Sequence, residues 1–197
     1  MPRPSNTEER RAEIAVALMH VMADHGYDGA TIQLIAKRAQ VQPGLVHYHF
    51  TDKLEILLQL IGAIGEFTTG RVNTALKTTA VPLEQVDAFI SSLLSRDKGA
   101  QPKLVAAWVC IGAEAVRNER VGAEYRKVID ALVERLEPVA ARLVPPKAAR
   151  ASAAAIVAAI QGYFVLAMTS PEAIPKGSAE ASVRRMARGL FGLDGKS

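Results

Sequence analysis

The stretch TIQLIAKRAQVQPGLVHYHFTDK, residues 31–53, decides the fold. Its apolar residues recur at spacings of three and four, which is typical of helices, and the pattern breaks only at 40–43. We expect one short helix from the N-cap Thr31 to about Ala39, and another that ends near Phe50. Two short helices joined by a tight turn form a helix-turn-helix.

The side chains of this stretch separate into a small core and an exposed set. The expected core consists of Ile32, Ile35, Val41, Val46 and Phe50, and Ala36 lets the two helices approach closely. The second helix leaves for solvent or DNA the side chains of Gln42, Leu45, His47, Tyr48 and His49. In a major groove the rings and hydroxyl reach phosphates, and glutamine can read a base edge. The alternative is an ordinary helical hairpin.

The same residues resemble the tetracycline-repressor (TetR) family over roughly residues 10–58. The match consists of Thr31, Ile35, Ala36, Ala39, Val41, Gly44, Tyr48, His49, Phe50 and Lys53. The resemblance implies a three-helix DNA-binding domain in which Thr31 and Lys53 contact phosphate and residues 44–49 enter the major groove. The DNA-contacting residues that we expect are Thr31, Gln33, Lys37, Gln42, Pro43, Gly44, Leu45, His47, Tyr48, His49 and Lys53.

Two positions depart from the family pattern. Gln40 stands in the turn where the family usually has glycine, so we expect Gln40 to adopt a positive φ after the short helix. His47 stands where the family often has tyrosine, so its phosphate contact differs and depends on pH. His47 and His49 do not form a metal site, because side chains two positions apart on a helix point about 200° apart.

Helical periodicity extends through the whole chain, and no alternating strand pattern appears. We predict an all-α fold of about nine helices. The first helix is capped at Ser5 and stopped by Gly26, and Asp52 with Glu55 caps a long fourth helix. Later helices begin at Pro82 and Pro102 or cover residues 121–143, 148–168 and 178–191.

The remainder of the chain forms the second predicted domain, residues 54–197, after a DNA-binding domain of residues 1–53. Residues 104–143 resemble the betaine-pathway repressor branch, which responds to choline-type compounds. An aromatic face near a carboxylate favours a cation, although Trp108 and Glu114 do not share a helix face, so another helix must complete such a site. The expected ligand-binding residues are Phe67, Trp108, Glu114, Tyr125 and Tyr163, each of which could instead be plain core.

Small and apolar residues of the last two helices predict a dimer interface. They are Ala151, Ala155, Ala158, Gly162, Val183, Met186, Ala187 and Leu190. Alanine in such number could also reflect helix propensity alone. Because alanine partitions weakly into membranes, we interpret the run from 151 to 168 as a buried helix rather than a membrane span.

Composition limits the functional classes to which the protein can belong. The net charge of +4 does not come from residues 1–53, which hold six basic and six acidic residues, so the DNA hypothesis depends on the motif. The start of the chain lacks an apolar leader, and the single Cys110 excludes an internal disulfide; we expect a cytoplasmic protein. No acid–base pair, nucleotide loop or metal spacing indicates an enzyme, a cofactor or a metal.

The sequence therefore predicts a bacterial repressor that binds a palindromic operator on double-stranded DNA as a homodimer and is released by a small-molecule inducer. A rival hypothesis is a DNA-binding regulator without small-molecule input, which acts constitutively or through a protein partner. A ligand-sized cavity in the C-terminal domain would favour the first hypothesis, and a solid core the second.

Overall fold

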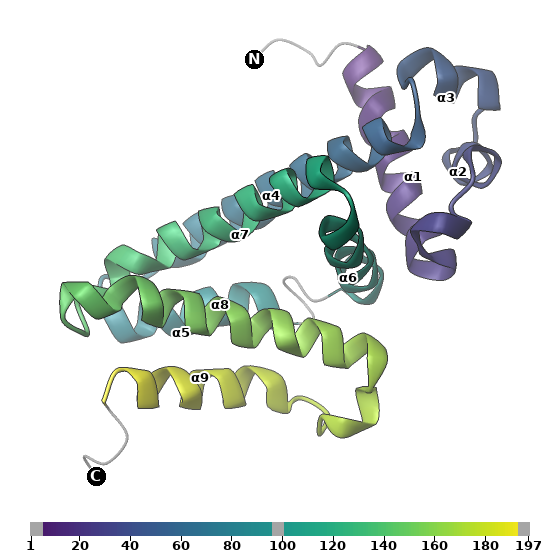
Figure 1. Cartoon of the computed structure of the whole chain (residues 1–197). Coiled ribbons are helices and arrows are strands. Elements are labelled where there is room, and N and C mark those ends of the chain that lie inside the picture. The colour runs from purple at the N-terminus through teal and green to yellow at the C-terminus, as the bar shows by residue number, and fades with distance from the viewer. Residues whose placement is uncertain (1–5, 96–100, 193–197) are drawn as a thin grey trace. The chain divides into compact units, whose positions relative to one another are not determined.

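The computed structural model describes residues 6–95 and 101–192 (Figure 1). Within these ranges the chain forms nine α-helices, one short 3-10 helix and no strand, which confirms the predicted fold class. The helices are α1 (Asn6–Gly29), α2 (Ile32–Ala39), α3 (Pro43–His49), α4 (Lys53–Leu76), α5 (Pro82–Leu94), α6 (Pro102–Arg117), α7 (Glu119–Ala140), α8 (Pro146–Thr169) and α9 (Ser178–Leu190). The expected cap at Ser5 lies outside the described residues.

Two compact units divide the chain. One consists of residues 1–66 and 102–126, and the other of residues 67–101 and 127–197. The first unit therefore holds α6 and the beginning of α7 together with α1–α3 and the beginning of α4. The predicted boundary after Lys53 does not coincide with the division between these two units. A functional boundary at that residue stays a prediction.

The first unit is built around α1, which packs against α2 and α6. Its apolar face buries Ile14, Leu18 and Met22, as the periodicity predicts. Gly26 interrupts the helical path with a φ of 69°, a value that glycine adopts without steric cost. The break redirects the chain toward α2, and the Ala30 N–H donates to the Tyr27 carbonyl at 3.1 Å.

The start of α4 is fixed by hydrogen bonds close to those predicted. Asp52 Oδ1 accepts from the Glu55 N–H at 2.7 Å, as expected for an N-cap. The reciprocal bond differs, because Glu55 Oε2 accepts from the Thr51 N–H at 2.8 Å and not from the N–H of Asp52. The Glu55 carboxylate therefore holds the residue before the cap.

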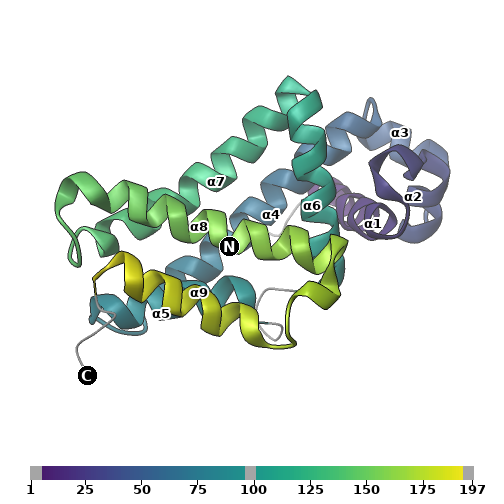
Figure 2. The same cartoon turned by 60° about the horizontal axis from the view of Figure 1, so that its bottom comes forward.

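The second unit has its core between α5, α7, α8 and α9, with Val72 from α4, and both views show α8 and α9 side by side (Figures 1 and 2). Phe89, Ile156 and Ile160 are buried there. By length and composition alone α8 could cross a membrane, and 28% of its apolar window is buried inside the protein. The predicted burial of α8 applies to one face only, because Ala151, Ala155 and Ala158 on its other face are exposed.

Candidate nucleic-acid interface

The turn between α2 and α3 sets the direction of the second helix. Thr31 Oγ1 caps α2 by accepting from the Leu34 N–H at 3.3 Å, and Gln40 ends it in the left-handed conformation (φ 57°, ψ 41°). Gln40 is the one non-glycine residue with positive φ in the described part of the chain, which confirms the predicted turn. The Val41 N–H then closes α2 by donating to the Ala36 carbonyl at 2.9 Å.

A small core holds α2 and α3 against α1. Ile35, Ala36, Val46 and Phe50 are buried as predicted, while Ile32 and Val41 are only half-buried. On the opposite face of α2, Gln33 and Lys37 are exposed one turn apart. This core leaves the outer faces of two short helices free for a partner.

The outer face of α3 is strongly exposed. Tyr48 has 79% of its surface accessible, and Pro43, Gly44, Leu45 and His47 are exposed as well. Gln42, at the N-cap, is exposed and its side chain makes no capping hydrogen bond, so its amide is available to a base edge. The helix therefore presents the polar and aromatic set that the sequence predicts, with one exception.

His49 is that exception, because it is half-buried rather than exposed. Its ring meets the Tyr48 ring edge-on at 5.0 Å between centroids, and its carbonyl accepts from Arg11. His49 thus orients Tyr48 and ties the end of α3 to α1, and less of its ring is available to DNA than we expected.

Gly44 lies near the start of α3 in open space. A Cβ built there would meet no atom within 4 Å. Glycine inside a helix costs up to about 1 kcal/mol relative to alanine. Packing within the described part of the chain therefore does not explain the glycine at this position.

Lys53 has an intramolecular partner. Its ammonium donates to the Tyr27 carbonyl at 2.7 Å and lies 4.2 Å from the centroid of the Tyr27 ring. Burial, with Glu114, Asp52 and Asp28 nearby, raises the pKa of Tyr27 to about 12. Lys53 therefore connects the end of α1 to the start of α4, and its contact with phosphate stays a prediction.

Arg11 is the residue of this region that the sequence analysis missed. Its guanidinium lies 4.1 Å from the centroid of the Phe50 ring, and its Nη2 donates to Glu55 Oε1 at 2.9 Å. The Thr51 N–H, then Arg11 and the Thr51 hydroxyl, lower the pKa of Glu55 to about 2. No local pattern could have revealed these contacts, because 38–44 residues of chain separate the partners.

The predicted ligand-binding residues fall in both units. In the first, the Trp108 and Tyr125 rings stack with centroids 4.7 Å apart at 22°, and Gly112 lies against Tyr125. Glu114, on the same helix as Trp108, is half-buried. In the second unit Phe67 is exposed beneath the Arg71 guanidinium, and Tyr163 packs on the core.

The residues expected at a dimer interface form an exposed apolar face on α8 and α9. Ala151, Ala155, Ala158 and Gly162 are exposed, and Met186 and Leu190 border a groove of about 370 Å³ that includes Ala155. Val183 and Ala187 differ: they are 0% and 1% exposed, because they pack in the chain's own core.

A helix-turn-helix whose second helix is exposed is typical of DNA-binding transcriptional regulators. Residues 14–60 match the family model for bacterial regulatory proteins of the tetR family, and residues 82–192 match the C-terminal model of BetI-type transcriptional repressors. The chain belongs to the TetR family, with a C-terminal domain of the BetI type.

Curated relatives support this membership. The chain is 34% identical over 122 residues to the HTH-type transcriptional regulator BetI of Rhizobium meliloti, a match that covers 61% of this chain and only 59% of that protein. It is 29% identical over 185 residues to the BetI regulator of Agrobacterium fabrum, across 92% of this chain and 86% of the relative.

Solved structures share the fold. A transcriptional regulator from Rhodococcus sp. Rha1 superposes with a TM-score of 0.83 at 24% identity, over 92% of this chain and 96% of that one. The regulator FadR from Bacillus subtilis, solved with stearoyl-CoA, has a TM-score of 0.73 at 19% identity and covers 92% and 98% of the two chains.

Proposed function

We propose that this protein is a cytoplasmic repressor that binds a palindromic operator as a homodimer through α2 and α3. The observation that carries the proposal is the exposed outer face of α3, where Gln42, His47 and Tyr48 project from a helix pinned by a buried core. The DNA phosphates are contacted from α2 and from the start of α4, by Thr31, Gln33, Lys37 and Lys53.

The exposed face of α8 and α9 supports the homodimer. Small side chains at Ala155, Ala158 and Gly162 permit close helix approach, and Met186 and Leu190 supply apolar surface that water would otherwise cover. A twofold dimer places two recognition helices about 34–36 Å apart, one turn of DNA. Two half-sites in inverted orientation follow from that symmetry.

We propose further that a small molecule, either of the choline type or another cationic or apolar compound, acts as inducer in the C-terminal domain. The stacked Trp108 and Tyr125 rings, with Glu114 on the same helix as Trp108, provide the aromatic and acidic groups that a cation prefers. Inducer and operator would then each lower the affinity for the other by the same factor.

A second candidate is a regulator without small-molecule input. Trp108 is only 7% exposed and Tyr125 covers one of its faces, which is also the packing of an ordinary core. Titration with choline and with short alkylammonium ions separates the two candidates, since only an inducible repressor releases operator DNA.

The oligomeric state of the protein tests the proposed homodimer, whose twofold symmetry is the reason to expect a palindromic operator. Ala158→Glu places like charges in an apolar seam and should yield monomers in sedimentation experiments. The matched control Ala12→Glu changes an exposed alanine of α1 and should leave a dimer. A dimeric Ala158→Glu variant would contradict the proposed interface.

A further inference from the structure

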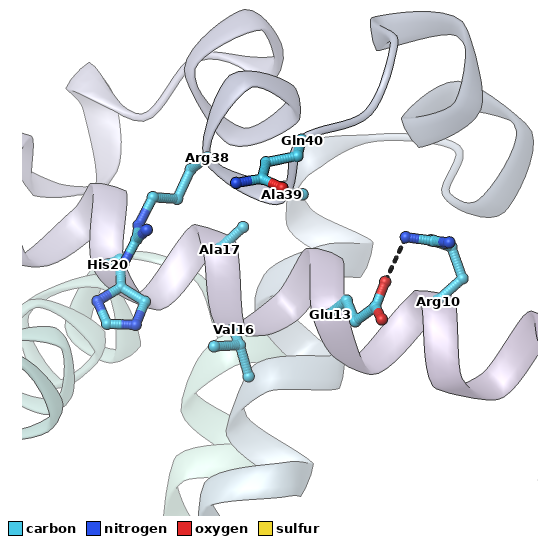
Figure 3. A pocket seen from close by; sticks show the side chains of 8 residues that line it. All are labelled: Arg10, Glu13, Val16, Ala17, His20, Arg38, Ala39 and Gln40. Carbon is cyan, nitrogen blue, oxygen red and sulfur yellow. Dashed lines mark hydrogen bonds and ion pairs between the residues drawn. The ribbon is translucent and has the colours of Figure 1, made fainter.

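A pocket of about 380 Å³ lies in the first unit, between the middle of α1 and the end of α2 (Figure 3). Ala17 and His20 line it from α1, and Arg38 and Gln40 line it from the other side. Figure 3 shows Arg38 extending from α2 toward His20, with the Gln40 amide above the α1 backbone. The pocket adjoins the turn that directs α3, but it includes none of the DNA-contacting residues proposed above.

The charges around this pocket do not cancel. Arg10 is paired with Glu13 at one end, and Lys103 is paired with Asp24 at 3.2 Å near the other. Arg38 is exposed, and among the described residues no carboxylate pairs with it. One guanidinium thus gives the pocket an uncompensated positive charge.

His20 adds a polar atom that lacks a partner. Its Nδ1 is buried and has no hydrogen-bond partner among the described residues. Burial, then the charges of Arg38 and Lys103, lower the pKa of His20, and Asp24 opposes them. The shift favours the neutral ring, in which one of the two nitrogens carries an N–H that can donate a hydrogen bond.

We propose that this pocket binds the oxyanion of a phosphate group, held by Arg38, His20 and the Gln40 amide. Arg38 supplies positive charge and a planar set of N–H donors. The His20 ring and the Gln40 amide each donate a further hydrogen bond to the anion. The volume exceeds the needs of a single phosphate and leaves room for a small organic group. Either a phosphorylated small molecule or a DNA backbone phosphate has this chemistry.

Nuclear magnetic resonance of the His20 ring in the full-length protein tests the proposal. The probes are inorganic phosphate and sulfate, the latter a dianion throughout the titration, against sodium chloride at equal ionic strength. A bound anion favours the imidazolium, so the pKa of His20 should rise by about one unit. Arg38→Gln should abolish the rise, while Arg120→Gln, an exposed arginine outside the pocket, should retain it.

A second experiment distinguishes a phosphorylated small molecule from a DNA backbone phosphate. If the free anions leave His20 unchanged but operator DNA raises its pKa in an Arg38-dependent way, the occupant is a backbone phosphate. If neither affects His20, or if Arg38→Gln responds as the wild type does, the proposed site does not exist. Circular dichroism of Arg38→Gln verifies that the variant is folded.

Discussion

The ammonium of Lys53, the first residue of α4, donates to the carbonyl of Tyr27 at 2.7 Å and lies over the ring of the same residue. The TetR resemblance assigns this lysine to a DNA phosphate. A lysine has three N–H donors, so one bond to Tyr27 leaves others for a phosphate. The intramolecular contact would then position the charge before DNA arrives.

Lys53→Ala should therefore have two effects. It should weaken binding to all DNA sequences alike and reduce the slope of log affinity against log salt by about one per subunit. It should also lower the free energy of unfolding by about 1 kcal/mol, because the Tyr27 carbonyl loses a charged donor. Salt-dependent binding and urea unfolding measure the two effects.

Lys77→Ala, which removes an exposed lysine just beyond the end of α4, is the matched control and should change neither quantity. A Lys53→Ala variant that loses stability but keeps the wild-type salt slope would show that Lys53 is structural and does not touch phosphate.

Glu55 should make stability depend on pH in the acid range. Its folded-state pKa of about 2 lies below the ordinary value of 4.5. The stabilisation is therefore fully present above about pH 4.5 and is lost as the pH falls toward 2. Glu55→Gln should lower the free energy of unfolding at pH 7 by about 1 kcal/mol, a value discounted for solvent screening because a third of the side chain is exposed.

Denaturant unfolding at a series of pH values measures this effect. The difference between wild type and Glu55→Gln should shrink below pH 4.5, whereas Glu134→Gln, on an exposed part of α7, should show no such trend. A difference that stays constant down to pH 2 would mean that Glu55 acts through packing and not through its charge.

Gly44→Ala should separate folding from DNA binding. The added methyl meets no atom of the described residues within 4 Å and favours the helix, so stability should rise by up to about 1 kcal/mol. Affinity for operator DNA should fall, because the methyl intrudes where the DNA backbone approaches. The control Gly62→Ala, in equally open space on α4, should raise stability and leave DNA affinity unchanged. Unchanged DNA binding by Gly44→Ala would remove Gly44 from the interface.

Gln40→Gly addresses the left-handed turn. A residue with a Cβ is strained there by roughly 1–2 kcal/mol, and the entropy that glycine gains in the unfolded chain offsets part of the relief. The net gain in stability should be at most about 1 kcal/mol in thermal or denaturant unfolding. Arg38→Gly, inside the last turn of α2, should instead destabilise. Destabilisation by Gln40→Gly would imply that its side chain contributes more than its backbone costs.

Local patterns predicted most of the fold because local chemistry determines it. The Thr31 cap, the Gln40 turn, and the proline starts of α5 and α6 depend on residues a few positions apart. The burial of Val183 and Ala187 within the chain could not be predicted, since an apolar helical face does not reveal whether α5, α8 or a second chain covers it.

The site was predictable only in part for the same reason. Gln42, His47 and Tyr48 could be placed on the outer face of α3 from their spacing around Val46. Arg11 could not, because its partners Phe50 and Glu55 are distant in sequence and depend on how α1 packs. The half-burial of His49 could not be predicted either, because exposure at the end of α3 depends on how α3 packs against α1.

The most direct test of the central claim is selection of bound fragments from genomic DNA by wild type and by Gln42→Ala in parallel. The wild type should enrich an inverted repeat with half-sites about one helical turn apart. Gln42→Ala should retain the repeat but lose discrimination at one base pair of each half-site, by about 1–3 kcal/mol. If the wild type enriches no sequence, or if both proteins enrich the same sequence with the same preference, α3 does not read the operator.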